Sequence, residues 1–87
     1  MQQTAAVRTP VAVARYFDEV VDRLTRAGID VAQIVLDLTP ARPMRGQLVI
    51  DRGRVLRWGE DLGWSNGVRT TSPSAHPSEV AGLLENL

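Results

Sequence analysis

The stretch QLVIDRGRVLRWGEDLGW, residues 47–64, decides the fold, because it contains two strand-like runs joined by a tight-turn signal. The runs, residues 47–51 and 54–58, are short and rich in apolar and β-branched side chains, as strands are. Arg52 and Gly53 lie between them, and glycine readily adopts the positive φ that a tight hairpin needs. We therefore predict an antiparallel hairpin at this point.

Two further strands are predicted around the hairpin. Residues 59–63 begin and end with glycine and favour a second turn, which leads into a strand over residues 64–69. An earlier strand is predicted over residues 31–38, and the two prolines within residues 39–45 prevent it from continuing. Together these runs predict a four-stranded antiparallel meander.

A helix is predicted on each side of the strands. Thr9 and Pro10 are typical of a helix start, and Gly28 favours a left-handed C-terminal stop. Between them the apolar residues recur on one helical stripe: Val13, Phe17, Val20, Val21 and Leu24. A last helix is predicted to begin at Pro77, with a second apolar stripe: Val80, Leu83, Leu84 and Leu87.

These elements predict an α+β fold of order α-β-β-β-β-α, with both helices packed on one face of the sheet. We expect one domain over residues 9–87, because 87 residues are too few for two cores, and a flexible arm over residues 1–8. Trp58 and Trp64 are expected on the same face, packed in the core. The predicted core consists of Leu36, Leu48, Ile50, Leu56, Trp58, Trp64 and Val68 against Phe17, Val21, Leu24 and Leu84.

The composition excludes several classes of site. The chain has no cysteine, which rules out disulfides, thiolate metal sites and cysteine nucleophiles, and one histidine is too few for a zinc site. We predict no cofactor. No apolar run approaches the roughly 20 residues of a membrane span, and no signal-peptide run is visible, so we expect no membrane contact and a cytoplasmic location.

Three residues could support an enzyme. Glu60 and Asp61 are adjacent carboxylates, and His76 is the only histidine, so together they could act as acid and base. The structural interpretation is simpler, because Glu60 and Asp61 lie in a predicted turn and His76 directly precedes the helix start at Pro77. A small enzyme is therefore the weakest of the functional alternatives.

Positive charge concentrates around the hairpin. Residues 42–57 contain five arginines against one acid, Asp51, for a local charge of five minus one, or +4. Arginine binds phosphate well, so this region could contact nucleic acid or a protein partner. Zero net charge over the chain favours the protein partner. The arginines are Arg42, Arg45, Arg52, Arg54 and Arg57.

The outer face of the sheet is expected to carry more apolar side chains than a solvated face needs. Alternation places Val35, Val49 and Val55 there. An apolar sheet face or an exposed strand edge suits association. The leading hypothesis is a non-enzymatic protein-binding or regulatory module that forms a homodimer, and the first alternative is a nucleic-acid-binding accessory protein.

The run Leu56 to Trp64 resembles a family of small actinobacterial domains of unknown function with the pattern L-x-W-x-E-x-x-G-W. The matching residues are Leu56, Trp58, Glu60, Gly63 and Trp64. All ten basic residues are arginine, which is typical of a GC-rich genome, as in an actinobacterium or its phage. The resemblance supports the fold and the lineage and implies no activity or catalytic residue.

Overall fold

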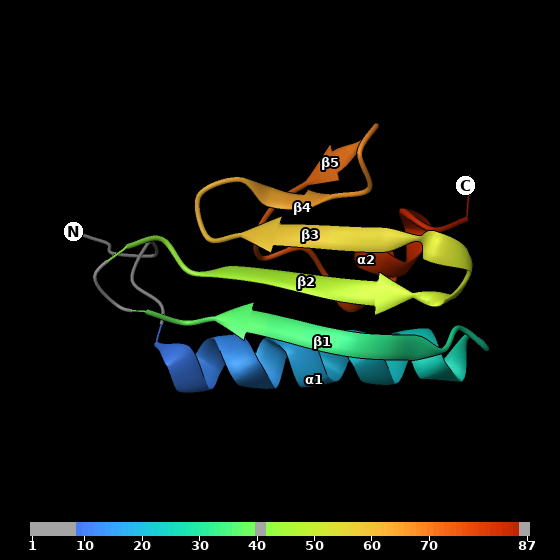
Figure 1. Ribbon diagram of the computed structural model, residues 1–87, viewed down its shortest axis with the longest axis horizontal. Helices are drawn as coiled ribbons and strands as arrows, with labels where there is room; N and C mark the ends of the chain where they lie inside the picture. The colour runs from blue at the N-terminus through green and yellow to red at the C-terminus, as the bar shows by residue number, and fades with distance from the viewer. Residues whose placement is uncertain (1–8, 40–41, 86–87) are drawn as a thin grey trace.

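The computed structural model describes residues 9–39 and 42–85. The predicted arm, residues 1–8, and Leu87 of the second apolar stripe lie outside the described residues. The chain forms an α+β fold with an antiparallel sheet, as predicted, and Figure 1 shows its strands side by side in chain order. The elements are α1 (Pro10–Arg26), β1 (Val31–Asp37), β2 (Arg45–Ile50), β3 (Val55–Gly59), β4 (Gly63–Ser65), β5 (Thr70–Thr71) and α2 (Pro77–Gly82).

The sheet has five strands, so the prediction of four was wrong by one. The predicted strand over residues 64–69 ends at Ser65, because Asn66 turns the chain. Its Oδ1 accepts hydrogen bonds from the N–H groups of Val68 and Arg69, at 2.8 and 2.7 Å, as asparagine often does in turns. The chain then returns as β5, paired with β4. Val68 is consequently 84% exposed and does not belong to the core, contrary to the prediction.

Helix α1 begins as predicted. The Thr9 Oγ1 accepts the N–H of Ala12 at 3.1 Å, and Pro10 occupies the first turn, where its missing N–H costs nothing. Gly28, with φ of 82°, lies just beyond the end of the helix. The predicted stripe is buried at Val13, Phe17, Val20 and Leu24, and half-buried at Val21.

The predicted hairpin is confirmed as β2 and β3. Val49 pairs with Val55, and the turn between them is Asp51–Gly53. Arg52 and Gly53 both have positive φ, 60° and 76°, which a type I′ hairpin turn requires.

The core is built around the two tryptophans. Trp58 pairs with Trp64 across β3 and β4, and both are buried, as predicted. The Phe17 ring of α1 lies against both, with ring centroids 5.4 Å from Trp58 and 5.1 Å from Trp64. Helix α2 packs against α1 and buries Val80 and Ala81. Among the described residues, no helix has the length and apolar composition needed to cross a membrane.

Gly46 of β2 makes room for the Phe17 ring, because a Cβ at that position would lie 2.3 Å from the Phe17 Cζ. We expect Gly46→Ala to lower the free energy of unfolding by about 1–3 kcal/mol, as overpacking does. The measurement is urea denaturation followed by tryptophan fluorescence. Gly82→Ala is the matched control, since its new Cβ would meet nothing within 4 Å apart from its chain neighbours and its own helix backbone. Equal stability of the two variants would contradict the prediction.

Candidate functional site

The strand side chains that alternate with the buried ones form a second surface, here called the outer face. Cross-strand pairing arranges these side chains in rows that run across the sheet. Its central row crosses all five strands and is therefore the longest. The rows are Gln33–Val49–Val55, then Val35–Gln47–Arg57–Ser65–Thr70, then Asp37–Arg45–Gly59–Gly63.

A hollow of about 600 Å³ lies on the outer face and is lined by residues of all five strands. Its lining includes the whole central row, together with Leu62 from the turn between β3 and β4. Gly59 and Gly63 also line the hollow, and neither position has room for a side chain. A Cβ at Gly59 would lie 2.4 Å from the Arg45 Nη1, and one at Gly63 would lie 1.9 Å from the Thr71 carbonyl oxygen.

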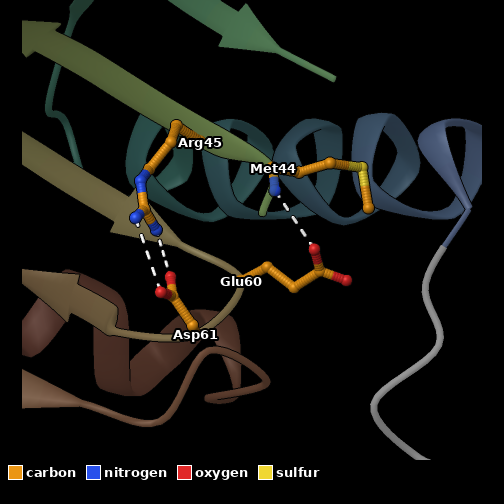
Figure 2. A network of polar contacts seen from close by, with 4 residues as sticks. All are labelled: Met44, Arg45, Glu60 and Asp61. Carbon is orange, nitrogen blue, oxygen red and sulfur yellow. Dashed lines mark hydrogen bonds and ion pairs between the residues drawn. The ribbon is translucent and has the colours of Figure 1, made fainter. Parts of the chain in front are cut away.

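The turn between β3 and β4 is fixed to the start of β2 by two carboxylates (Figure 2). The Glu60 Oε1 accepts the Met44 N–H at 3.1 Å, and the Glu60 N–H donates to the Met44 carbonyl at 2.9 Å. Arg45 donates from both of its terminal nitrogens to the Asp61 carboxylate, with Nη2 and Oδ2 3.4 Å apart. This hydrogen-bonded ion pair lowers the pKa of Asp61 and raises that of Arg45.

His76 has a structural position as well. Its Nδ1 accepts the N–H of Ser78 at 3.1 Å, while the Glu79 carboxylate accepts the His76 N–H, which together form a capping box on α2. Neither the hollow nor a smaller one of about 210 Å³ beside Tyr16 and Pro73 is lined by Glu60, Asp61 or His76. The described part of the chain contains no group of three or more metal-ligating side chains.

The five arginines around the hairpin do not form one surface. Arg45 begins β2 and is paired with Asp61, whereas Arg52 lies in the turn that follows the other end of β2 (Figure 1). Arg54 pairs with Asp51 at 2.5 Å. Arg42 adds to the two Thr39 hydrogen bonds that chiefly hold the pKa of Asp37 below its usual value.

Arg57 differs from Arg45 and Arg54 in that no acid of the described residues pairs with it. It lies at the centre of the central row, exposed in the hollow, and its side chain forms no ion pair or hydrogen bond within residues 9–39 and 42–85. The hollow therefore contains one cation that is available to a ligand.

The predicted valines are not equivalent. Val35 is 45% exposed and lines the hollow, whereas Val49 and Val55 are half-buried and pair with each other near the β2–β3 turn. Leu62, 69% exposed, was not predicted as a site residue. The signal available for it was an apolar side chain within the otherwise polar turn after Trp58.

Comparison of the chain with protein-family models, curated proteins and solved structures gave no match. The resemblance to the actinobacterial family therefore stays a prediction. In this chain the five residues of the pattern all have a role in folding. Leu56, Trp58 and Trp64 are buried, Glu60 bonds to Met44, and Gly63 has φ of 83°.

We expect Asp61→Asn to reduce the fall in Tm that the protein shows as the pH is lowered into the acid range. An aspartate whose pKa is lowered in the folded state stabilises the fold above its unfolded pKa of about 3.9, and that stabilisation is lost as the pH falls through the folded pKa. The wild type should therefore lose more in Tm than the variant between about pH 6 and pH 2.5, measured by circular dichroism.

Asp30→Asn provides the control, because Asp30 is exposed and has no ion pair within the described ranges. Its pH profile should match that of the wild type. Parallel profiles for wild type and Asp61→Asn would show that the Arg45–Asp61 pair does not stabilise the turn.

Proposed function

We propose that the chain is a non-enzymatic protein-binding or regulatory module whose contact surface is the hollow on the outer face. We infer that both helices cover the opposite face of the sheet, where Phe17 packs on Trp58 and Trp64. The observation that carries the proposal is apolar exposure in the lining of the hollow, where Val35 is 45% and Leu62 69% exposed. A hollow of about 600 Å³ is within the usual range for binding sites.

The contacts of the ionisable side chains favour this proposal over an enzyme. Glu60, Asp61 and His76 each have a partner that fixes a turn or a helix end, and none of them faces the hollow. Acid–base catalysis needs groups within hydrogen-bond reach of a bound substrate. These three residues are therefore better explained by the stability of the fold.

Nucleic-acid binding is also less well supported. Duplex recognition depends on several arginines or lysines that neutralise successive phosphates. Here Arg45 and Arg54 are paired with acids, and Arg52 lies beyond the end of β2. The remaining positive charge is too dispersed for a phosphate-binding surface.

We also propose that the chain forms a homodimer. We propose a cytoplasmic location, in a GC-rich bacterium or its phage. Strand β1 is an edge strand of seven residues, and its Ile34 and Val35 are 44% and 45% exposed. Long apolar edge strands favour pairing with another chain. Light scattering at micromolar concentration should give twice the chain mass of 9.5 kDa, and the double variant Ile34→Arg, Val35→Arg should give a monomer. A monomeric wild type would remove the dimer from the proposal.

The protein-binding surface is tested by peptide display against the purified chain. Selected peptides should compete with one another and shift the NMR signals of Val35 and Leu62. Val35→Ser with Leu62→Ser should weaken binding by about ten-fold or more, because both apolar contacts are lost. Val68→Ser is the matched control, since Val68 is equally apolar, 84% exposed and outside the hollow. The proposal would be contradicted if the double variant bound the peptides as tightly as the wild type. It would also be contradicted if the Val68→Ser control lost binding.

A further inference from the structure

The central row of the outer face presents hydrogen-bond donors around one free cation. Arg57 pairs across the sheet with Gln47 on β2 and with Ser65 on β4, and Ser65 pairs with Thr70. Directly opposed side chains lie about 5 Å apart, so these polar groups are within reach of the same ligand. Gln47, Ser65 and Thr70 are neutral, which leaves Arg57 to determine the charge that the row prefers.

Within the described residues, no acid forms an ion pair with Arg57. Asp37 also lines the hollow and keeps its negative charge, so Arg57 is the part of the lining that favours an anion. Asp61 is bound to Arg45, and Asp37 accepts the N–H and the hydroxyl of Thr39, the hydroxyl at 2.6 Å. Arg57 is therefore the available partner for an anion that enters the hollow. An arginine fork binds a carboxylate through paired, charge-assisted hydrogen bonds.

The apolar part of the lining favours a ligand that carries an apolar side chain as well as a negative charge. Val35 and Leu62 are exposed in the lining of the hollow, so a bare anion would leave this apolar surface in water. A ligand that also carries an apolar side chain would cover it, at roughly 25 cal/mol per Å² of apolar area removed from water. One free arginine and an apolar lining suit a carboxylate better than a run of phosphates.

The length of the row favours a segment of polypeptide over a small molecule. From Val35 on β1 to Thr70 on β5 the row crosses four strand spacings, about 19 Å at ~4.8 Å each. An extended segment of about six residues has this length. A single small carboxylate would contact only Arg57 and its nearest neighbours.

We infer that the hollow binds an extended acidic segment of a partner protein, with one carboxylate on Arg57 and a neighbouring apolar side chain between Val35 and Leu62. This inference rests on the proposed protein-binding function and names the chemistry of the partner. It assigns Arg57 the role of selecting for charge and the two apolar side chains that of anchoring the segment.

The test uses two blocked hexapeptides, Ser-Leu-Glu-Leu-Ser-Ser and the same sequence with Gln in place of Glu, titrated into the ¹⁵N-labelled full chain. The Glu peptide should bind about ten-fold more tightly, because only it offers a charge-assisted bond to Arg57. Arg57→Gln should remove the difference. Arg52→Gln, which removes an exposed arginine outside the hollow, should keep it.

The opposite results are equally specific. Equal affinity of the two peptides, the same preference in Arg57→Gln, or no shift at the hollow up to millimolar peptide would each overturn the acidic-segment inference. Free 4-methylpentanoate binding as tightly as the Glu peptide would also overturn it, in favour of a small-carboxylate site. The proposed function is judged separately by the displayed peptides, so a partner without acidic residues would leave that function standing.

Discussion

The fold depends on one aromatic cluster, which contains every aromatic side chain in the protein: Tyr16, Phe17, Trp58 and Trp64. The cluster joins α1 to β3 and β4, and its polar atoms extend it to the segment before α2. The Trp58 indole N–H donates to the Pro73 carbonyl at 3.0 Å, the Trp64 indole N–H to the Tyr16 hydroxyl at 2.9 Å, and that hydroxyl to the Ala75 carbonyl. A small domain has few such contacts, so each aromatic pair, at about 0.5–1.5 kcal/mol beyond burial, is a large share of its stability.

The same cluster determines what the outer face can present. Because strand side chains alternate, an inward Trp58 requires its neighbours Arg57 and Gly59 to face outward. An inward Trp64 does the same for Gly63 and Ser65. The position of Arg57 in the hollow is therefore a direct consequence of how the tryptophans are buried.

Local signals in the sequence were sufficient for most of the elements. The Thr9 cap, the stripe of α1 and the Arg52-Gly53 turn depend on near neighbours, and they form where the sequence predicts them. The failure at Val68 came from a side-chain hydrogen bond, since Asn66 breaks a run whose apolar pattern still indicates a strand.

The site was harder to predict than the fold. The pairing of Arg54 with Asp51 is local, because the two residues are three apart. The pairing of Arg45 with Asp61 joins residues 16 apart and forms only when the start of β2 meets the turn between β3 and β4. The hollow also depends on long-range geometry, because its lining combines all five strands with Leu62. Val35 could be placed on the outer face by alternation, whereas the availability of Arg57 required knowing where every nearby acid is bound.

The pattern L-x-W-x-E-x-x-G-W includes residues that determine the fold and positions that line the hollow. Its specified residues are buried, hydrogen-bonded to the backbone or in the left-handed conformation, so they determine the fold. Three of its unspecified positions, Arg57, Gly59 and Leu62, line the hollow, together with the specified Trp58 and Gly63. Gly59 is constrained by the Arg45 side chain beside it, whereas Arg57 and Leu62 are exposed. Substitutions at Arg57 and Leu62 can therefore change the charge and shape of the hollow while the sheet and the aromatic cluster are kept.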